Sequence, residues 1–232
     1  MSIIDKDTIV NASILDVLPQ IPDGTFDSCI LDVPYEQEAH NRGFSRKRSI
    51  WAEMSEWTSL ENDWYSVDLM REYCRICKFP NLFCFGSKRD VWSLLQFAES
   101  EKLFYDIIPV CKKAPAPFTN NNWLSNEYAV HITDRKLGYT KDYNLKIPYF
   151  IVGGQKTTGH PNEKDLPMMK RIVANITREG DFVFDGFMGS GTTALACQSL
   201  KRHFFGCEIN KEYYEKSLKR LDDESRQGEL FK

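Results

Sequence analysis

The chain has 232 residues, of which 42% are hydrophobic and 27% are charged, and its formal net charge is −3. This composition is ordinary for a globular protein, and the length suffices to bury one sizeable core, so we expect a single domain over residues 1–232. The longest apolar runs are far shorter than the roughly 18 to 20 residues that cross a bilayer, and no secretory pattern opens the chain. These features exclude a membrane-spanning protein and predict a soluble, cytoplasmic one.

The seven cysteines are odd in number and irregularly spaced. Cys29, Cys84 and Cys207 lie inside apolar, strand-like runs, where a reduced thiol behaves as a small hydrophobe. Cys74 and Cys77 form one CxxC, but no second ligand pair follows at metal spacing. We therefore expect reduced cysteines that pack in the core, and no metal site.

Strand and helix signals alternate along the chain, which predicts an α/β fold with a mostly parallel, seven-stranded sheet covered by helices on both faces. The predicted strands are 8–11, 27–32, 82–85, 105–111, 128–133, 182–185 and 204–208. The predicted helices are 66–77, 90–100, 164–176, 192–200 and 211–223. Residues 36–63 and 136–159 break the order and are expected to be inserted loops, which are often functional at this length.

The sequence LDVPY, residues 31–35, closes the second predicted strand with an acid, a proline and an aromatic ring. A strand-end carboxylate such as Asp32 often caps a turn, and that is the simplest interpretation of this motif alone. Pro34 restricts Val33 to extended geometry and stiffens the turn that follows. The motif therefore becomes informative only together with the rest of the chain.

The sequence FVFDGFMGSGTT, residues 182–193, runs from a predicted strand through a glycine-rich turn into a helix. Glycines there allow a ligand to approach the backbone closely, although tight strand-to-helix packing would also favour them. Glu208 follows about twenty residues later, where Rossmann-like folds place the acid that binds ribose hydroxyls. The turn lacks Gly-Lys-Ser/Thr, and its spacing is GxxGxG, so the expected ligand has a ribose and no pyrophosphate.

Four segments together resemble the AdoMet-dependent DNA amino-methyltransferases. DVPY resembles their DPPY catalytic motif and FDGFMGSGTT their DPFxGSGT cofactor motif, while HPNEKDLPMMKRIV and HFFGCEINKEYYEKSLKRL are similar to two further family segments. Asp32 precedes Asp185, an order that resembles the beta class. The resemblance implies a circularly permuted, Rossmann-like methyltransferase fold with S-adenosyl-L-methionine (AdoMet) as cofactor and DNA as partner.

The resemblance also implies catalytic roles. Asp32 and the backbone carbonyl of Val33 would accept hydrogen bonds from the target amino group, whose lone pair is otherwise delocalised into the ring. Tyr35 would stack on the extruded base, and Pro34 would keep the motif rigid. The methyl group would then move by direct displacement, without a metal or a covalent enzyme intermediate.

The cofactor residues implied by matching position lie along the second motif and after it. Asp185 would bind the methionine amino group of AdoMet and Glu208 its ribose. The full set is Asp185, Phe187, Gly189, Ser190, Gly191, Thr192, Glu208 and Lys164. Three assignments stay open: Thr192 and Thr193 could instead cap the helix, Lys164 could hold the methionine carboxylate or be an exposed lysine, and Ile209 could contact the adenine, although a core position is favoured.

Three positions depart from the family motifs. Val33 replaces the first proline of the catalytic motif, Gly186 replaces the proline of the cofactor motif, and Ser13 stands at the position of the usual leader acid. A backbone acceptor survives the change to valine. Ser13 would remove a cofactor contact if the leader acid makes one, and Gly186 could loosen the turn, so modest affinity for AdoMet is expected.

A basic run follows the catalytic motif. It comprises Arg42, Arg46, Lys47 and Arg48, and three tryptophans, Trp51, Trp57 and Trp64, lie after it. These cations could contact DNA phosphates or form a solvated face, and the sequence favours neither. Lys112, Lys113 and residues 136–156 are further candidates, and no separate recognition domain is visible. Because beta-class relatives are often homodimers, two copies are expected to share one duplex.

The expected activity is therefore DNA methylation at N6 of adenine, because the motif begins with Asp rather than with the Ser common in N4-cytosine enzymes. N4-cytosine methylation is the first alternative. A weakly active AdoMet-fold regulator that binds DNA or a partner is the second, and the three departures motivate it. Methylation of RNA or a small molecule is a third. The sequence specifies neither the target sequence nor a restriction partner.

Overall fold

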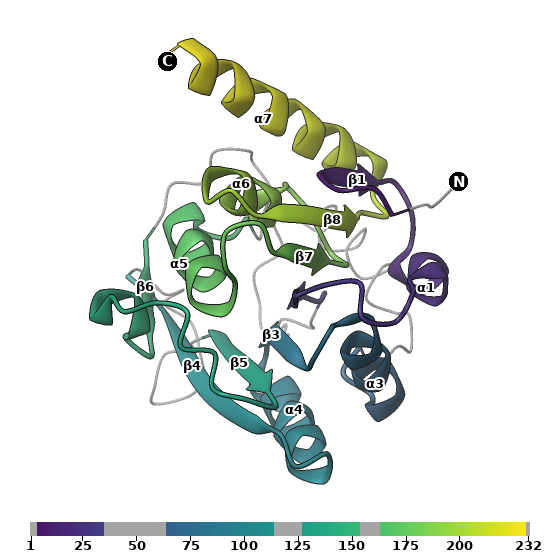
Figure 1. Cartoon of the computed structure of the whole chain (residues 1–232), viewed down its shortest axis with the longest axis vertical. Coiled ribbons are helices and arrows are strands. Elements are labelled where there is room, and N and C mark those ends of the chain that lie inside the picture. The colour runs from purple at the N-terminus through teal and green to yellow at the C-terminus, as the bar shows by residue number, and fades with distance from the viewer. Residues whose placement is uncertain (1–3, 35–63, 114–126, 154–162, 231–232) are drawn as a thin grey trace, which may run out of the picture.

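The computed structural model describes residues 4–34, 64–113, 127–153 and 163–230 (Figure 1). In this part of the chain eight strands form one sheet in the order β1-β8-β7-β2-β3-β5-β4-β6. The strands are β1 (Thr8–Val10), β2 (Ser28–Asp32), β3 (Asn81–Gly86), β4 (Phe104–Lys112), β5 (Glu127–Thr133), β6 (Phe150–Val152), β7 (Phe182–Asp185) and β8 (His203–Cys207). Only β5 runs antiparallel to its two neighbours, so the sheet is mostly parallel.

Helices cover both faces of this sheet (Figure 1). On one side lie α1 (Ile14–Val17), α3 (Val67–Ile76) and α4 (Lys88–Ser100), and on the other α5 (Leu166–Ile176) and α6 (Thr192–Ser199). The long α7 (Lys211–Leu230) contacts α6 and β1, and two short 3₁₀ helices, η1 (Leu18–Gln20) and η2 (Tyr143–Lys146), complete the described elements. The expected α/β fold class is confirmed.

The core consists of two apolar layers that the strands divide by alternation. In β2, Cys29 and Leu31 pack on the side of α3 and α4, while Ile30 packs on the side of α5 and α6. Successive side chains of a strand point to opposite faces, so each buried parallel strand contributes to both layers. β2 and β7 are adjacent and parallel, so the acidic residues that end them lie at the same edge of the sheet.

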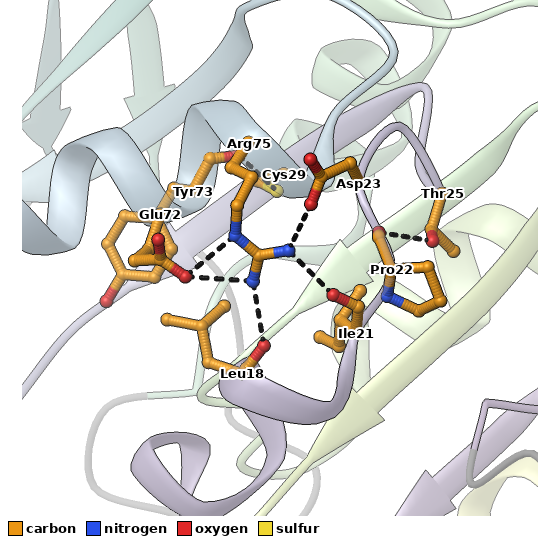
Figure 2. A network of polar contacts seen from close by, with 9 residues as sticks. All are labelled: Leu18, Ile21, Pro22, Asp23, Thr25, Cys29, Glu72, Tyr73 and Arg75. Carbon is orange, nitrogen blue, oxygen red and sulfur yellow. Dashed lines mark hydrogen bonds and ion pairs between the residues drawn. The ribbon is translucent and has the colours of Figure 1, made fainter.

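Arg75 of α3 fixes the chain that leads into β2 (Figure 2). Its guanidinium donates hydrogen bonds to the carbonyl oxygens of Leu18, at 3.1 Å, and Ile21, at 2.8 Å, and it forms ion pairs with Asp23 and Glu72. Because the guanidinium binds two carbonyl oxygens of this segment as well as Asp23, the N-terminal segment is held against α3.

Two sequence expectations need correction. The sheet has eight described strands rather than seven, because β6 lies within residues 136–159, which were expected to be a loop and which also contain η2. A strand of three residues at the sheet edge is too short to show alternation, and Ile151 within it is 60% exposed. The helix α1 was not predicted either, since four residues leave no periodicity to detect.

No helix among the described residues is long and apolar enough to cross a membrane.

Candidate active site

Three acidic side chains lie at one edge of the sheet, at the carboxyl ends of the adjacent strands β8, β7 and β2. Asp185 ends β7, Asp32 ends β2 and Glu208 directly follows β8. The ends of parallel strands meet at the same edge, where ligands of open α/β sheets bind. Residues far apart in the sequence are thereby gathered around one position, as the two motifs predicted.

Asp185 is 3% exposed. Its Oδ1 accepts a hydrogen bond from the Phe187 N–H at 2.9 Å, and Thr193 donates a second one from its side chain. Burial, helped by the neighbouring charges of Asp32 and Glu208, raises the pKa of Asp185 to about 7, although the hydrogen bonds from Thr193 and Phe187 lower it. A cation placed next to this carboxylate would favour its charged form and lower this pKa.

The carboxylate of Glu208 binds the backbone of the glycine-rich turn. Its Oε2 accepts the backbone N–H of Gly189 at 2.7 Å, and its Oε1 accepts that of Asn210 at 2.8 Å. Burial raises its pKa as well. Asn11, at the end of β1, donates to the Glu208 carbonyl oxygen at 2.8 Å. The carboxylate is thus fixed by backbone donors and retains further lone pairs for a ligand hydroxyl.

The turn itself is shaped by its glycines. Gly191 has a φ of 80°, in the left-handed region that favours glycine, and is the N-cap of α6. The alternative that Thr192 or Thr193 caps this helix is therefore wrong: Thr193 binds Asp185, and the Thr192 Oγ1 accepts from Arg220 at 3.0 Å.

The space beside Gly186 explains one departure from the family motif. A Cβ at this position would lie 2.0 Å from Cδ1 of Ile14, so the Ile14 side chain occupies the place that a proline ring would need. Ser13, the second departure, is the N-cap of α1 and accepts the Leu15 N–H. The turn is therefore packed against α1, contrary to the expectation that Gly186 would loosen it.

Asp32 forms an ion pair that the motif did not predict. The Lys164 Nζ lies 2.9 Å from Oδ1 of Asp32 and 3.3 Å from Oε2 of Glu127, at the start of β5. It also lies 4.7 Å from the centre of the Phe85 ring. The side chains of the two acids are 20% exposed and that of Lys164 10%. Lys164 is therefore a largely buried partner of Asp32, and the alternative of an exposed lysine is wrong.

The backbone under Asp32 is supported by Tyr65, which is 2% exposed. Its hydroxyl lies 2.5 Å from the carbonyl oxygen of Phe85 and 3.3 Å from that of Leu31. Val33 is buried in the core and Pro34 is exposed. The chain thus leaves the core between these two residues, directly after Asp32.

Arg220 of α7 connects the two halves of the site. It donates to the carbonyl oxygen of Ser190 at 3.1 Å and to Thr192, while its Nη2 forms an ion pair of 2.9 Å with Glu163, the residue before Lys164. The side chains of Arg220 and Glu163 are 18% and 5% exposed. This buried ion pair joins the glycine turn to the segment that carries Lys164.

Other predicted site residues lie at the rim or outside the described residues. Phe187 is half-buried and packs edge-to-face on Trp64, with 5.0 Å between ring centres. Ile209 is 48% exposed, so the favoured core position is wrong for it. Tyr35, the basic run Arg42, Arg46, Lys47 and Arg48, and Trp51 and Trp57 lie outside the described residues. Among the described residues, no group of His, Cys, Asp or Glu could hold a metal ion.

Sequence reasoning missed Glu127, Tyr65, Arg220 and Glu163. Glu127 begins a strand, and only the reversed direction of β5 brings that beginning to the edge where the parallel strands end. Arg220 lies in the Lys-Arg-Leu sequence that ends one of the family-like segments. Nothing in that segment predicts its contacts with Ser190 and Thr192, which lie 30 and 28 residues earlier. These contacts are tertiary, and a single sequence carries no local signal for them.

The arrangement fits AdoMet as a ligand. AdoMet carries a sulfonium and an ammonium, and the edge offers the two buried carboxylates of Asp185 and Glu208, with pKa values raised because they are buried. The glycine turn lies between them, and the Gly189 N–H is held by Glu208. Acidic side chains beside a close backbone turn suit a small cationic nucleoside.

Comparisons with known proteins identify the family and the fold. A family model described as DNA methylase matches residues 27–219. The type II methyltransferase M2.DpnII of Streptococcus pneumoniae is 25% identical over 250 residues, which are 95% of this chain and 91% of that protein. The crystal structure of the M1.HpyAVI–SAM complex aligns with a TM-score of 0.68 at 27% identity, over 92% of this chain and 98% of the other. The cytosine-N4-specific PvuII DNA methyltransferase, at 12% identity and a TM-score of 0.67, shares the fold.

Proposed function

Because this chain belongs to the beta class of the DNA methylase family, which transfers methyl groups from AdoMet to N6 of adenine or N4 of cytosine, we propose that it methylates N6 of adenine in DNA. The observation that carries the proposal is Asp32, an acid of the DVPY motif that ends β2 next to β7, which ends at Asp185. We propose adenine as the target base and assign the roles of the individual residues below.

Asp32 acts on the amino group of the target base. The nitrogen lone pair is delocalised into the ring, so the amino group is a weak nucleophile. A carboxylate oxygen of Asp32 and the carbonyl oxygen of Val33 accept the two N–H bonds and favour a tetrahedral nitrogen whose lone pair is available. Tyr35 stacks on the base after its extrusion from the duplex, since the amino group cannot be reached inside the helix.

The cofactor residues hold AdoMet beside that nitrogen. When bound, AdoMet supplies an electrophilic methyl group on a positively charged sulfur. Asp185 accepts hydrogen bonds from the cofactor's amino group, and Glu208 accepts them from its ribose. Phe187, Gly189, Ser190, Gly191 and Thr192 line the methionine. Positioning of two reactants in this way can supply a large part of the rate acceleration.

N4 of cytosine is the second candidate. Its amino group poses the same chemical problem, and an acid in the first motif position can bind either base. Asp32 favours adenine because serine is common at this position in N4-cytosine enzymes. Hydrolysis of the methylated DNA to nucleosides, followed by mass spectrometry, separates N6-methyladenine from N4-methylcytosine.

Substitution of Asp32 tests the catalytic proposal. Asp32→Ala is expected to lower single-turnover methyl transfer to unmethylated genomic DNA by at least about 10² to 10³, the usual loss for one preorganised hydrogen-bonding partner. AdoMet affinity is expected to stay within about threefold of wild type, because Asp185 and Glu208 remain. Transfer is followed with labelled AdoMet, and affinity by calorimetry.

A matched variant distinguishes loss of chemistry from loss of structure. Asp32→Asn keeps the shape and one acceptor oxygen while removing the charge, and thermal unfolding is recorded for both variants. An Asp32→Ala protein that folds, binds AdoMet and still methylates DNA near the wild-type rate contradicts the proposal. A failure of both variants to fold would favour the turn-capping role instead. If folded wild-type protein transfers no methyl group to any DNA tested, the result would favour the alternative of an AdoMet-fold regulator.

A further inference from the structure

The edge of the sheet at which Asp32 lies has an acidic half on one side of β2. Asp185 ends β7 and Glu208 follows β8, and both strands lie on this side. Lys211, which also follows β8, forms an ion pair of 3.9 Å with Glu215. A cationic cofactor is attracted to this acidic half, and a polyanion is repelled from it.

Exposed cations lie on the other side of β2, in a basic half formed by β3 and β4. Lys88 and Arg89 begin α4, which follows β3, and Lys113 follows β4, which runs parallel to β3. All three side chains are exposed, and none forms an ion pair within the described part of the chain. Two acids on this side have donors: Asp90 accepts the N-cap N–H of α4 at 2.6 Å, and Glu127 lies 3.3 Å from a lysine ammonium.

The strand register sets how far these cations lie from Asp32. Asp32 pairs with Phe85 of β3, and Lys88 lies three residues after Phe85. Because neighbouring strands are about 4.8 Å apart and a residue spans at most about 3.6 Å, the Lys88 Cα lies within roughly 16 Å of the Asp32 Cα. Through β5, Asp32 is level with Ile108 of β4, and Lys113 lies five residues further along, about 16 Å beyond that level. A duplex carries a phosphate of each strand about every 3.4 Å along its axis, so several phosphates lie within such distances of one base.

The stem of Lys113 packs against the neighbouring strand. The Lys113 N–H donates to the carbonyl oxygen of Val152 at 2.8 Å and continues the pairing of β4 with β6. A Cβ at Gly153 would lie 2.5 Å from Cδ of Lys113, so the aliphatic stem runs directly over this glycine. A lysine packed in this way keeps its ammonium in water, where a phosphate can bind it.

We propose that the DNA duplex lies over the basic half of the edge, where Lys88, Arg89 and Lys113 contact backbone phosphates, while the acidic half holds AdoMet. This inference rests on the proposed function, in which Asp32 receives a base of DNA. Asp32 ends the strand between the two halves, so the base and the cofactor reach it from opposite sides. Contacts to phosphates orient a protein on a duplex without reading its sequence. The three cations therefore position the duplex whatever the target sequence is.

Lysine footprinting of the wild-type protein tests this placement. An amine-reactive N-hydroxysuccinimide ester labels exposed lysines, and mass spectrometry of the digested protein compares each lysine with and without a saturating DNA duplex. Lys88 and Lys113 are expected to lose their labelling when DNA is bound, whereas Lys102 and Lys201, at the opposite edge of the sheet, keep theirs. Protection of Lys211 in place of Lys88 and Lys113 puts the duplex over the acidic half and overturns the inference.

The salt dependence of binding tests the charges themselves. The triple variant Lys88→Gln, Arg89→Gln, Lys113→Gln is expected to bind a duplex at least about tenfold more weakly at about 50 mM salt, and its slope of log K against log salt should be flatter by about 2 to 3. Its affinity for AdoMet is expected to stay within about threefold of wild type, because the cofactor lies on the acidic half. An unchanged slope shows that these cations do not contact phosphates.

A matched control removes the same total charge from the opposite edge of the sheet. Lys102→Gln, Arg178→Gln and Lys201→Gln replace exposed side chains that precede β4, β7 and β8. This control variant is expected to keep the wild-type slope. If it flattens the slope as much as the first triple variant does, binding responds to total charge and not to position, and the inference fails.

The outcomes distinguish this inference from the proposed function. An unchanged slope in the first triple variant, together with loss of methyl transfer in Asp32→Asn, refutes the placement of the duplex and leaves the proposed function standing. Near wild-type transfer in Asp32→Asn refutes the catalytic role of Asp32, while the footprint and the slope still locate the duplex. Thermal unfolding is recorded for every variant. Because the footprint uses the wild-type protein, it decides the inference even if a variant does not fold.

Discussion

Asp185 is a buried acid whose ionisation opposes folding. Its pKa in the folded protein is about 7, above the ordinary value near 3.9, so the native state binds its proton more tightly than the unfolded state does. The free energy of unfolding therefore falls as pH rises from about 4 to about 7, and the whole loss is present above pH 7. Sites that bind cations commonly carry such a cost, which the ligand then relieves.

Removal of this charge should stabilise the protein without AdoMet. Asp185→Asn keeps an acceptor for the Phe187 N–H, so we expect the free energy of unfolding to rise by about 2 to 4 kcal/mol at pH 8 and to match wild type near pH 4. Denaturant unfolding across this pH range measures the difference. Asp16→Asn, at an exposed carboxylate of α1, controls for the loss of one charge. A difference that does not change with pH contradicts the prediction.

At the level of elements, the sequence predicted the long helices and the buried strands because burial imposes a regular pattern on them. The helix predicted at 66–77 appears as α3 and the strand predicted at 182–185 as β7. The short edge strand β6 and the short helix α1 lack such a pattern. The same limit applies to the site: Asp32 and Asp185 follow from strand-end motifs, whereas the contact between Lys164 and Glu127 depends on how β5 pairs.

The packing of α1 on the glycine turn leads to a prediction about these two elements. Gly186→Ala would place a Cβ 2.0 Å from Cδ1 of Ile14, and overpacking of this kind costs about 1 to 3 kcal/mol. Ile14→Val removes Cδ1 and by itself costs about 0.5 to 1.5 kcal/mol. We expect the cost of Gly186→Ala to be smaller in the Ile14→Val background, because the closest atom is gone.

Chemical unfolding of the two single variants and the double variant measures this coupling. Gly180→Ala is a useful comparison, since a Cβ there meets no atom within 4 Å and its cost reflects only the positive φ of 86°. Strictly additive effects of Gly186→Ala and Ile14→Val would show that Ile14 does not fill the place of the motif proline.

Across the whole molecule, the balance of charge bears on how DNA binds at the site. The net charge is −3, and the edge that carries Asp32, Asp185 and Glu208 is acidic. A polyanion such as DNA would be repelled from this edge unless cations accompany the target base. The cations nearest to Asp32 in the sequence are those of the basic run, Arg42, Arg46, Lys47 and Arg48, which follow it within 16 residues.

Salt dependence tests whether the basic run contacts DNA. Each phosphate that a protein neutralises contributes about −0.9 to the slope of log K against log salt, so replacement of all four cations by Ala should weaken binding and flatten the slope by roughly 2 to 4. Binding is measured by fluorescence anisotropy on one duplex between about 50 and 200 mM salt.

The matched control replaces four cations by Ala at the opposite edge, Lys78, Lys102, Arg178 and Lys201, which precede parallel strands. We expect the control to keep the wild-type slope, because those side chains face away from the base. An unchanged slope in the first variant would make the basic run a solvated face, and DNA would then have to be held by other cations.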